Sequence, residues 1–108
     1  MDAWDLDRID AERSAAGERY REFVRVPDLS AGLYVLEAGA TDPQSPHQED
    51  ELYHVVSGRA TITVGGESQD VRPGSLVFVA ARVPHRFHDI VERLVVLVLF
   101  GPSEGSRA

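Results

Sequence analysis

Residues 51–71, ELYHVVSGRATITVGGESQDV, carry the pattern that decides the fold. β-Branched and aromatic residues are mixed with polar ones here, which is typical of half-buried strands. Gly65-Gly66 has the composition of a two-residue hairpin turn. Ser57-Gly58 is a second expected break, so two strands should precede the hairpin turn. The stretch predicts antiparallel β-structure.

Further segments with the composition of strands lie on both sides of this stretch. Residues 31–39, 76–80 and 93–100 are short apolar segments bounded by glycine or proline turns. Short strands with turn signals at intervals of about ten residues indicate an all-β sandwich or barrel. We therefore expect an all-β fold.

The two ends of the chain lack the strand pattern. Residues 1–25 are polar, and Leu6 and Ile9 share one face of a short helix, so we expect an N-terminal helix or arm. A disordered tail is the alternative for this segment. Residues 26–102 should form a single β-barrel domain, and residues 103–108 a frayed C-terminus.

The composition excludes several classes of protein. The formal charge of −7 argues against nucleic acid as a partner, because phosphate binding needs a basic surface. The 108 residues include no cysteine and no lysine, which removes disulfides, thiolate ligands and Schiff-base chemistry. The longest apolar run, residues 94–100, is too short to cross a membrane. No secretory signal is visible, so we expect a cytoplasmic location.

Histidines and acidic residues are concentrated in residues 45–58, SPHQEDELYHVVSG. Two backbone conformations could bring some of them together as metal ligands. On a helix, His47, Glu51 and His54 would lie on one face. On a strand, His47, Glu49 and Glu51 share one side and His54 points to the other. The β-branched pair Val55-Val56 favours the strand.

His85 supplies a second imidazole downstream, in the segment VPHRFHDI. Two neutral imidazoles and one carboxylate form a three-ligand set with open positions, which suits Fe(II) and also accepts Mn, Ni or Zn. The simpler interpretation is a solvated polar face, since clusters of acids are common on protein surfaces.

The order of these residues resembles that of the cupin superfamily, whose small members are single-domain jelly-roll β-barrels. The first cupin motif runs from a glycine through two histidines and a glutamate to a second glycine. GATDPQSPHQEDELYHVVSG (39–58) follows it, with Glu51 six residues before Gly58 and His47 at the second histidine. Ser45 stands at the first histidine.

The second cupin motif resembles RPGSLVFVAARVPHRFHD (72–89). Pro73, Gly74 and His85 match it, while its aspartate, second proline, second glycine and asparagine are replaced. The resemblance covers about residues 31–100. It implies a small cupin with His47, Glu51 and His85 as ligands of a divalent transition metal.

Several neighbours acquire expected roles from the same resemblance. Because Ser45 replaces a ligand, we expect an additional ligand or a supporting contact from Gln44, Glu49 or His54. Tyr53 and Phe87 share strand parity with Glu51 and His85 and are candidates for the substrate pocket or the core. We place His88 at the surface and Asp42 in a turn without a functional role.

Three functions are compatible with these features. The first is a metal-dependent enzyme, of dioxygenase or isomerase type, acting on a small oxygen-bearing molecule. The alternatives are a non-catalytic small-molecule or metal-binding cupin, and a metal-free regulatory or structural domain. Apolar side chains on the N-terminal arm (Leu6, Ile9, Tyr20) need a surface to cover them, and with the habit of the family they predict a homodimer.

Overall fold

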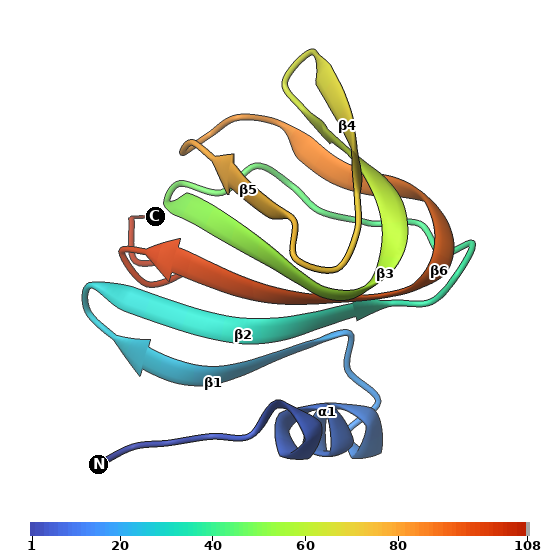
Figure 1. The fold of residues 1–108 in the computed structure, drawn as a ribbon. Coiled ribbons are helices and arrows are strands. Elements are labelled where there is room, and N and C mark those ends of the chain that lie inside the picture. The colour runs from blue at the N-terminus through green and yellow to red at the C-terminus, as the bar shows by residue number, and fades with distance from the viewer. Residues whose placement is uncertain (108) are drawn as a thin grey trace.

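The computed structural model describes residues 1–107, and they form a single short helix and a six-stranded antiparallel sheet. The elements are α1 (Leu6–Ala15), β1 (Tyr20–Val26), β2 (Leu29–Leu36), β3 (Asp50–Val64), β4 (Glu67–Val71), β5 (Leu76–Val79) and β6 (His85–Gly101). The strand order is β1-β2-β6-β3-β4, and β5 pairs with β3. Figure 1 shows the sheet curling over its own interior, with α1 beneath β1 and β2. The predicted all-β barrel with a short N-terminal helix is confirmed.

The two long strands β3 and β6 produce the curl. They pair from Asp50 opposite Gly101 to Val64 opposite His85, with shifts of register midway. Gly58 lies at these shifts with φ of 92°, and a Cβ atom there would collide with the backbone of Arg93. Only glycine allows this approach, and the irregularity bends the strand. The predicted break at Ser57-Gly58 is therefore wrong, because β3 continues through it, whereas the hairpin at Gly65-Gly66 is confirmed.

The concave face of the sheet encloses the main core. Its larger members include Tyr53, Phe87, Leu36, Ile62 and Leu94, all of them fully or almost fully buried. A second, smaller cluster lies on the outer face, where Ile9 of α1 packs against β2 and β6.

The N-terminal segment contributes more to the sheet than the sequence predicts. YREFVRV (20–26) forms β1 and pairs with β2, so the sheet includes residues that the sequence assigns to the N-terminal arm. Ile9 is 4% exposed because it lies on the chain's own sheet, and Tyr20 is half-buried. Ile9 and Tyr20 are thus covered within one chain, whereas Leu6 stays exposed, so the arm gives only a weak argument for a dimer. Within the described residues, no helix has the length and apolar character needed to span a membrane.

The C-terminal segment is held against the barrel. Glu49 is 2% exposed, and its carboxylate accepts hydrogen bonds from the backbone N–H of Gly105 (2.8 Å) and of Arg107 (3.1 Å). Ser103 is buried. Residues 103–107 are thus bonded to the barrel, where the sequence led us to expect a frayed end, and Ala108 lies outside the described residues.

Candidate metal centre

Three residues predicted as ligands meet inside the barrel. His47 lies in the loop before β3, Glu51 is the second residue of β3, and His85 begins β6. One nitrogen or oxygen atom of each lies within 4.8 Å of those of the other two. Glu51 and His85 are buried, and His47 is partly exposed. Residues from three separate segments therefore supply two imidazoles and one carboxylate to a single point.

Strand alternation explains which side chains of β3 reach this point. Glu51 and Tyr53 face the interior and are 3% and 0% exposed, whereas Leu52 and His54 face outward. Because residues 50–64 form a strand, the helical arrangement of His47, Glu51 and His54 is excluded. His54 lies on the opposite face of the sheet from the centre.

The hydrogen bonding of His85 orients its other nitrogen toward Glu51. Nδ1 lies 2.9 Å from the carbonyl oxygen of Val83, which only accepts, so Nδ1 carries a proton. In the neutral ring Nε2 then has a free lone pair, which lies 3.1 Å from Oε1 of Glu51. Burial lowers the pKa of His85, but the interactions with Glu51 and Val83 outweigh it and raise the pKa overall.

Oε1 of Glu51 is buried and, apart from the ion pair that a protonated His85 can form with it, has no hydrogen-bond partner among the described residues. The nearby Nε2 of neutral His85 offers a second lone pair, so the two atoms have nothing to share unless a proton or a cation lies between them. Buried polar groups without partners are rare in proteins and costly. A divalent metal ion would satisfy both lone pairs, so the donor set fits a metal.

His47 is held from two sides. Its ring lies edge-on to Phe100 with a centroid separation of 4.9 Å, and its carbonyl oxygen accepts a hydrogen bond from the backbone N–H of Arg82 (2.6 Å). Nδ1 lies 3.7 Å from Oε2 of Glu104. Ligating histidines commonly direct their second nitrogen to a carboxylate or carbonyl group, as Nδ1 of His85 does here.

A buried network supports the centre from the loop before β3. Tyr53 donates a hydrogen bond to Oε1 of Gln44 (2.7 Å), and the same oxygen lies 3.2 Å from Nε2 of His85. The Gln44 amide donates to Asp42 (2.6 Å), which also accepts from Tyr34 (2.6 Å). Burial and the charge of Glu51 raise the pKa of Tyr53, so it stays a donor at neutral pH. Asp42 is thus a buried acceptor, contrary to the prediction of a turn without a role.

The other predicted residues divide clearly. Gln44 lies beside His85, as expected of a supporting contact or additional ligand. Both carboxylate oxygens of Glu49 accept hydrogen bonds from backbone N–H groups of the C-terminal segment, so its prediction as a ligand is not supported. Phe87 packs against Tyr53 at a centroid distance of 5.0 Å and belongs to the core. His88 bonds to Thr63 (2.7 Å), away from the centre.

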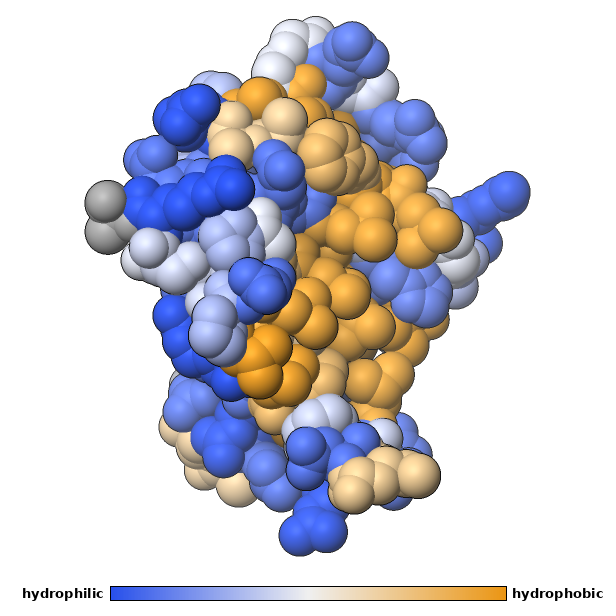
Figure 2. Space-filling view, turned by 90° about the vertical axis from the view of Figure 1, so that its left-hand side faces the viewer, coloured by the Kyte–Doolittle hydropathy of each residue, from blue (hydrophilic) through white to orange (hydrophobic). Residues whose placement is uncertain are grey.

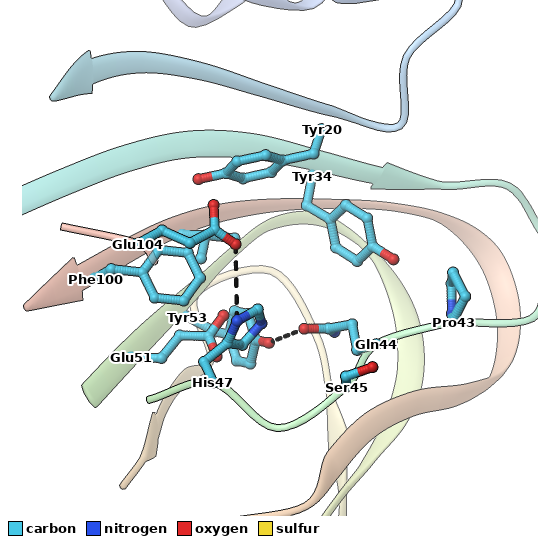
Figure 3. Close-up of a pocket in the computed structure, with 11 residues that line it drawn as sticks. Tyr20, Tyr34, Pro43, Gln44, Ser45, His47, Glu51, Tyr53, Phe100 and Glu104 are labelled. Carbon is cyan, nitrogen blue, oxygen red and sulfur yellow. Dashed lines mark hydrogen bonds and ion pairs between the residues drawn. The ribbon is translucent and has the colours of Figure 1, made fainter. Parts of the chain in front are cut away.

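A cavity of about 330 Å³ opens onto the centre. Figure 3 shows Tyr20 at the top and His47, Glu51 and Gln44 below it, with Phe100 and Glu104 between them on the left. Its lining residues are Tyr20, Tyr34, Pro43, Gln44, Ser45, His47, Glu51, Tyr53, Val98, Phe100 and Glu104. Sequence reasoning missed Tyr20, Tyr34 and Glu104 as site residues, because Tyr20 and Glu104 lie in the segments taken for an arm and a frayed end.

Comparison with known proteins agrees with this architecture. The sequence model of the family described as "Cupin domain" matches residues 32–100. An uncharacterised protein of Streptomyces coelicolor, SCO3923, is 54% identical over 104 residues, which cover 96% of this chain and 99% of that protein.

Solved structures share the fold at lower identity. TT1209 from Thermus thermophilus superposes with a TM-score of 0.77 at 22% identity and covers 95% of this chain and 99% of its own. The DMSP lyase DddQ from Ruegeria pomeroyi gives a TM-score of 0.69 at 22% identity, with 82% of this chain and 49% of the lyase covered.

Proposed function

The chain belongs to the cupin-domain family, and from that premise we propose that it is a metal-dependent enzyme acting on a small oxygen-bearing molecule. A dioxygenase or an isomerase is the reaction type that we infer. His47, Glu51 and His85 would hold the metal, and Fe(II) suits two imidazoles and one carboxylate best, with Mn, Ni and Zn as alternatives.

The observation that carries the proposal is the buried Oε1 of Glu51, which lies 3.1 Å from Nε2 of His85 and has no hydrogen to share with it when that ring is neutral. A purely structural carboxylate at 3% exposure would be expected to have its lone pairs satisfied, as those of Glu49 are. A divalent metal supplies Lewis acidity to oxygen atoms that occupy its open positions.

The remaining side chains prepare the site for a bound molecule. Val83 fixes the tautomer of His85, and Phe100 fixes the ring of His47. Gln44 lies beside the position of the missing family histidine, with a carbonyl oxygen directed at the centre and held by Tyr53. The adjoining cavity is within the size range of small-molecule pockets. Substrate would thus bind beside the metal and between aromatic walls.

The test is reconstitution followed by turnover. Metal-free protein is loaded with Fe(II), Mn(II), Ni(II) or Zn(II), and metal content is measured together with oxygen uptake and isomer formation over a panel of hydroxylated substrates. We expect turnover with one metal, its loss in His85→Ala, and its retention in the matched control His88→Ala, whose ring lies away from the centre. Metal-loaded protein without turnover on any substrate would favour a binding protein instead.

We further propose a homodimer formed through the outer face of β3 and β5. Leu52 lies opposite Phe78 on this face, and their neighbour Leu76 is 66% exposed. Figure 2 shows apolar residues gathered in a band down one side of the molecule. Contiguous exposed apolar surface of this kind is typical of association sites. Light scattering of wild type and of Phe78→Glu tests this: a dimer that becomes monomeric supports the proposal, and a monomeric wild type contradicts it.

A further inference from the structure

The cavity contains a second buried polar atom without a partner. The hydroxyl oxygen of Tyr20 is buried and makes no hydrogen bond to any described residue. Tyr20 begins β1, and its ring meets that of Tyr34 edge-on at a centroid distance of 6.2 Å. Burial, followed by nearby acidic groups, raises the pKa of Tyr20, so the hydroxyl is protonated and able to donate.

The position of Tyr20 depends on a glycine beneath it. A Cβ atom at Gly32 would collide with Cζ and the hydroxyl oxygen of Tyr20. Any side chain at residue 32 would therefore displace the ring from the cavity. The unpaired hydroxyl thus occupies a place that the neighbouring strand leaves open for it.

Glu104 reaches the same cavity from the C-terminal segment. Its backbone N–H donates to Ser30 (2.8 Å), and its carbonyl oxygen accepts from Arg25 (2.6 Å). The two bonds from Glu49 to the following amides fix the segment further. With the backbone held in this way, the carboxylate lies over the cavity, 3.7 Å from His47 (Figure 3).

The charges around the cavity restrict what enters it. Its described lining contains two carboxylates, Glu51 and Glu104, and no arginine. A metal would engage Glu51, but Glu104 would still face the bound molecule and oppose a second negative charge. Tyr20, Tyr34 and Phe100 supply aromatic walls around these groups. The lining therefore favours an uncharged molecule that has hydroxyl groups to donate and oxygen atoms to accept.

The geometry points to Tyr20 and Glu104 as the residues that select the ligand, an uncharged polyhydroxylated compound such as a sugar or a catechol. Tyr20 donates to one oxygen of this ligand, and one of its hydroxyl groups donates to Glu104. The inference rests on the proposed function, because the same ligand would present a further oxygen to the metal centre. Both residues lie outside residues 32–100, the segment that matches the family. The choice of ligand would therefore depend on segments that the family model does not cover.

Calorimetry with matched pairs of compounds tests this selection. The probes are glucose and glucuronate, galactose and galacturonate, and catechol and protocatechuate, each titrated into metal-loaded protein. We expect the uncharged member of at least one pair to bind more tightly than its acid. Tyr20→Phe and Glu104→Gln should each weaken that binding by about tenfold, the effect of one lost hydrogen bond in a buried site. Gly32→Ala should match Tyr20→Phe, and the exposed Glu92→Gln should bind like wild type.

Two further readouts separate the outcomes. Ligand-free Tyr20→Phe should unfold at the same or a higher temperature than wild type, because the hydroxyl has no partner to lose. Metal content is measured in every variant, and a wild type without bound metal would refute the proposed function. With metal retained, unchanged binding in both variants, tighter binding of every acid, or no binding of any uncharged probe would overturn the selection by Tyr20 and Glu104.

Discussion

Replacing Glu51 with glutamine separates a metal ligand from a structural ion pair. Above the pKa of His85, the metal-free wild type places two lone pairs 3.1 Å apart, on Oε1 of Glu51 and on Nε2 of His85. The glutamine amide would turn one of these acceptors into a donor and remove a buried charge. We therefore expect Glu51→Gln to stabilise the metal-free protein in alkaline buffer, at about pH 8.5 and above the raised pKa of His85.

The size of this effect follows from the contacts. One gained neutral hydrogen bond contributes ~1 kcal/mol to the free energy of unfolding. For a domain of this size, 1 kcal/mol raises the Tm by about 4–8 °C. A structural buried ion pair would behave in the opposite way, since breaking one costs about 3–5 kcal/mol. Metal at about a hundred times its Kd would add about 2.7 kcal/mol to the free energy of unfolding of wild type alone. Wild type would then be more stable than Glu51→Gln.

The pH dependence has a defined sign. The pKa of folded His85 is raised above 6.5, so the pairing of its protonated ring with Glu51 stabilises the protein fully below that value. This contribution is lost as the pH rises through the folded pKa. In metal-free protein, wild type should therefore be more stable than Glu51→Gln at about pH 5.5, and the order should invert in alkaline buffer.

Thermal unfolding by circular dichroism, with chelator and with added Zn(II), measures all of these comparisons. Glu49→Gln is the matched control, because Glu49 is equally buried but accepts a hydrogen bond at each carboxylate oxygen. It should lower the Tm with and without metal. A Glu51→Gln protein that is several kcal/mol less stable than wild type at about pH 8.5 without metal would refute the reasoning.

Three further predictions concern the same region. Metal affinity should fall as the pH drops through the raised pKa of His85, because a proton then occupies the ligating nitrogen. Competition titration with a chelating dye measures this affinity, and an affinity that does not change with pH argues against His85 as a ligand. Ser45→His should raise metal affinity by about tenfold or more (about 1.4 kcal/mol) by adding an imidazole at the cavity wall, as the same titration would report, and unchanged affinity would show that residue 45 cannot reach the metal. Glu49→Gln should speed hydrogen exchange at the Gly105 amide by at least about tenfold, while the amides of β3 keep their protection; an unaffected Gly105 would mean that the carboxylate does not hold the C-terminal segment.

The sequence contained enough information for the barrel and for the three converging residues. Alternating polarity and a Gly-Gly turn identify the β3–β4 hairpin, since both signals are local. The resemblance of residues 39–58 and 72–89 to the two cupin motifs implies His47, Glu51 and His85 as the set that meets. Strand parity placed Glu51 and Tyr53 on one face, whereas the expectation that His54 could support the centre is wrong, because His54 lies on the opposite face of β3.

The supporting and selecting residues depend on tertiary contacts that no local pattern records. Asp42 looks like a turn former, but the folded chain buries it and gives it three hydrogen-bond donors, from Tyr34, Gln44 and the backbone of Phe87. The strand at Tyr20 was missed because charged residues interrupt its apolar ones next to a polar N-terminal segment, and its place in the fold comes from pairing with β2. Glu104 lies in a glycine- and serine-rich end, which is held in place by tertiary contacts with Glu49, Ser30 and Arg25.

The central claim is that His47, Glu51 and His85 bind one divalent metal ion, and the metal content of purified protein tests it most directly. Mass spectrometry of elemental content on protein reconstituted without oxygen should give about one transition-metal ion per chain, as a three-ligand site requires. The ratio should fall to background in His85→Ala and in Glu51→Gln, and it should be unchanged in His88→Ala. A wild type that retains no metal, or variants that retain as much as wild type, would contradict the claim.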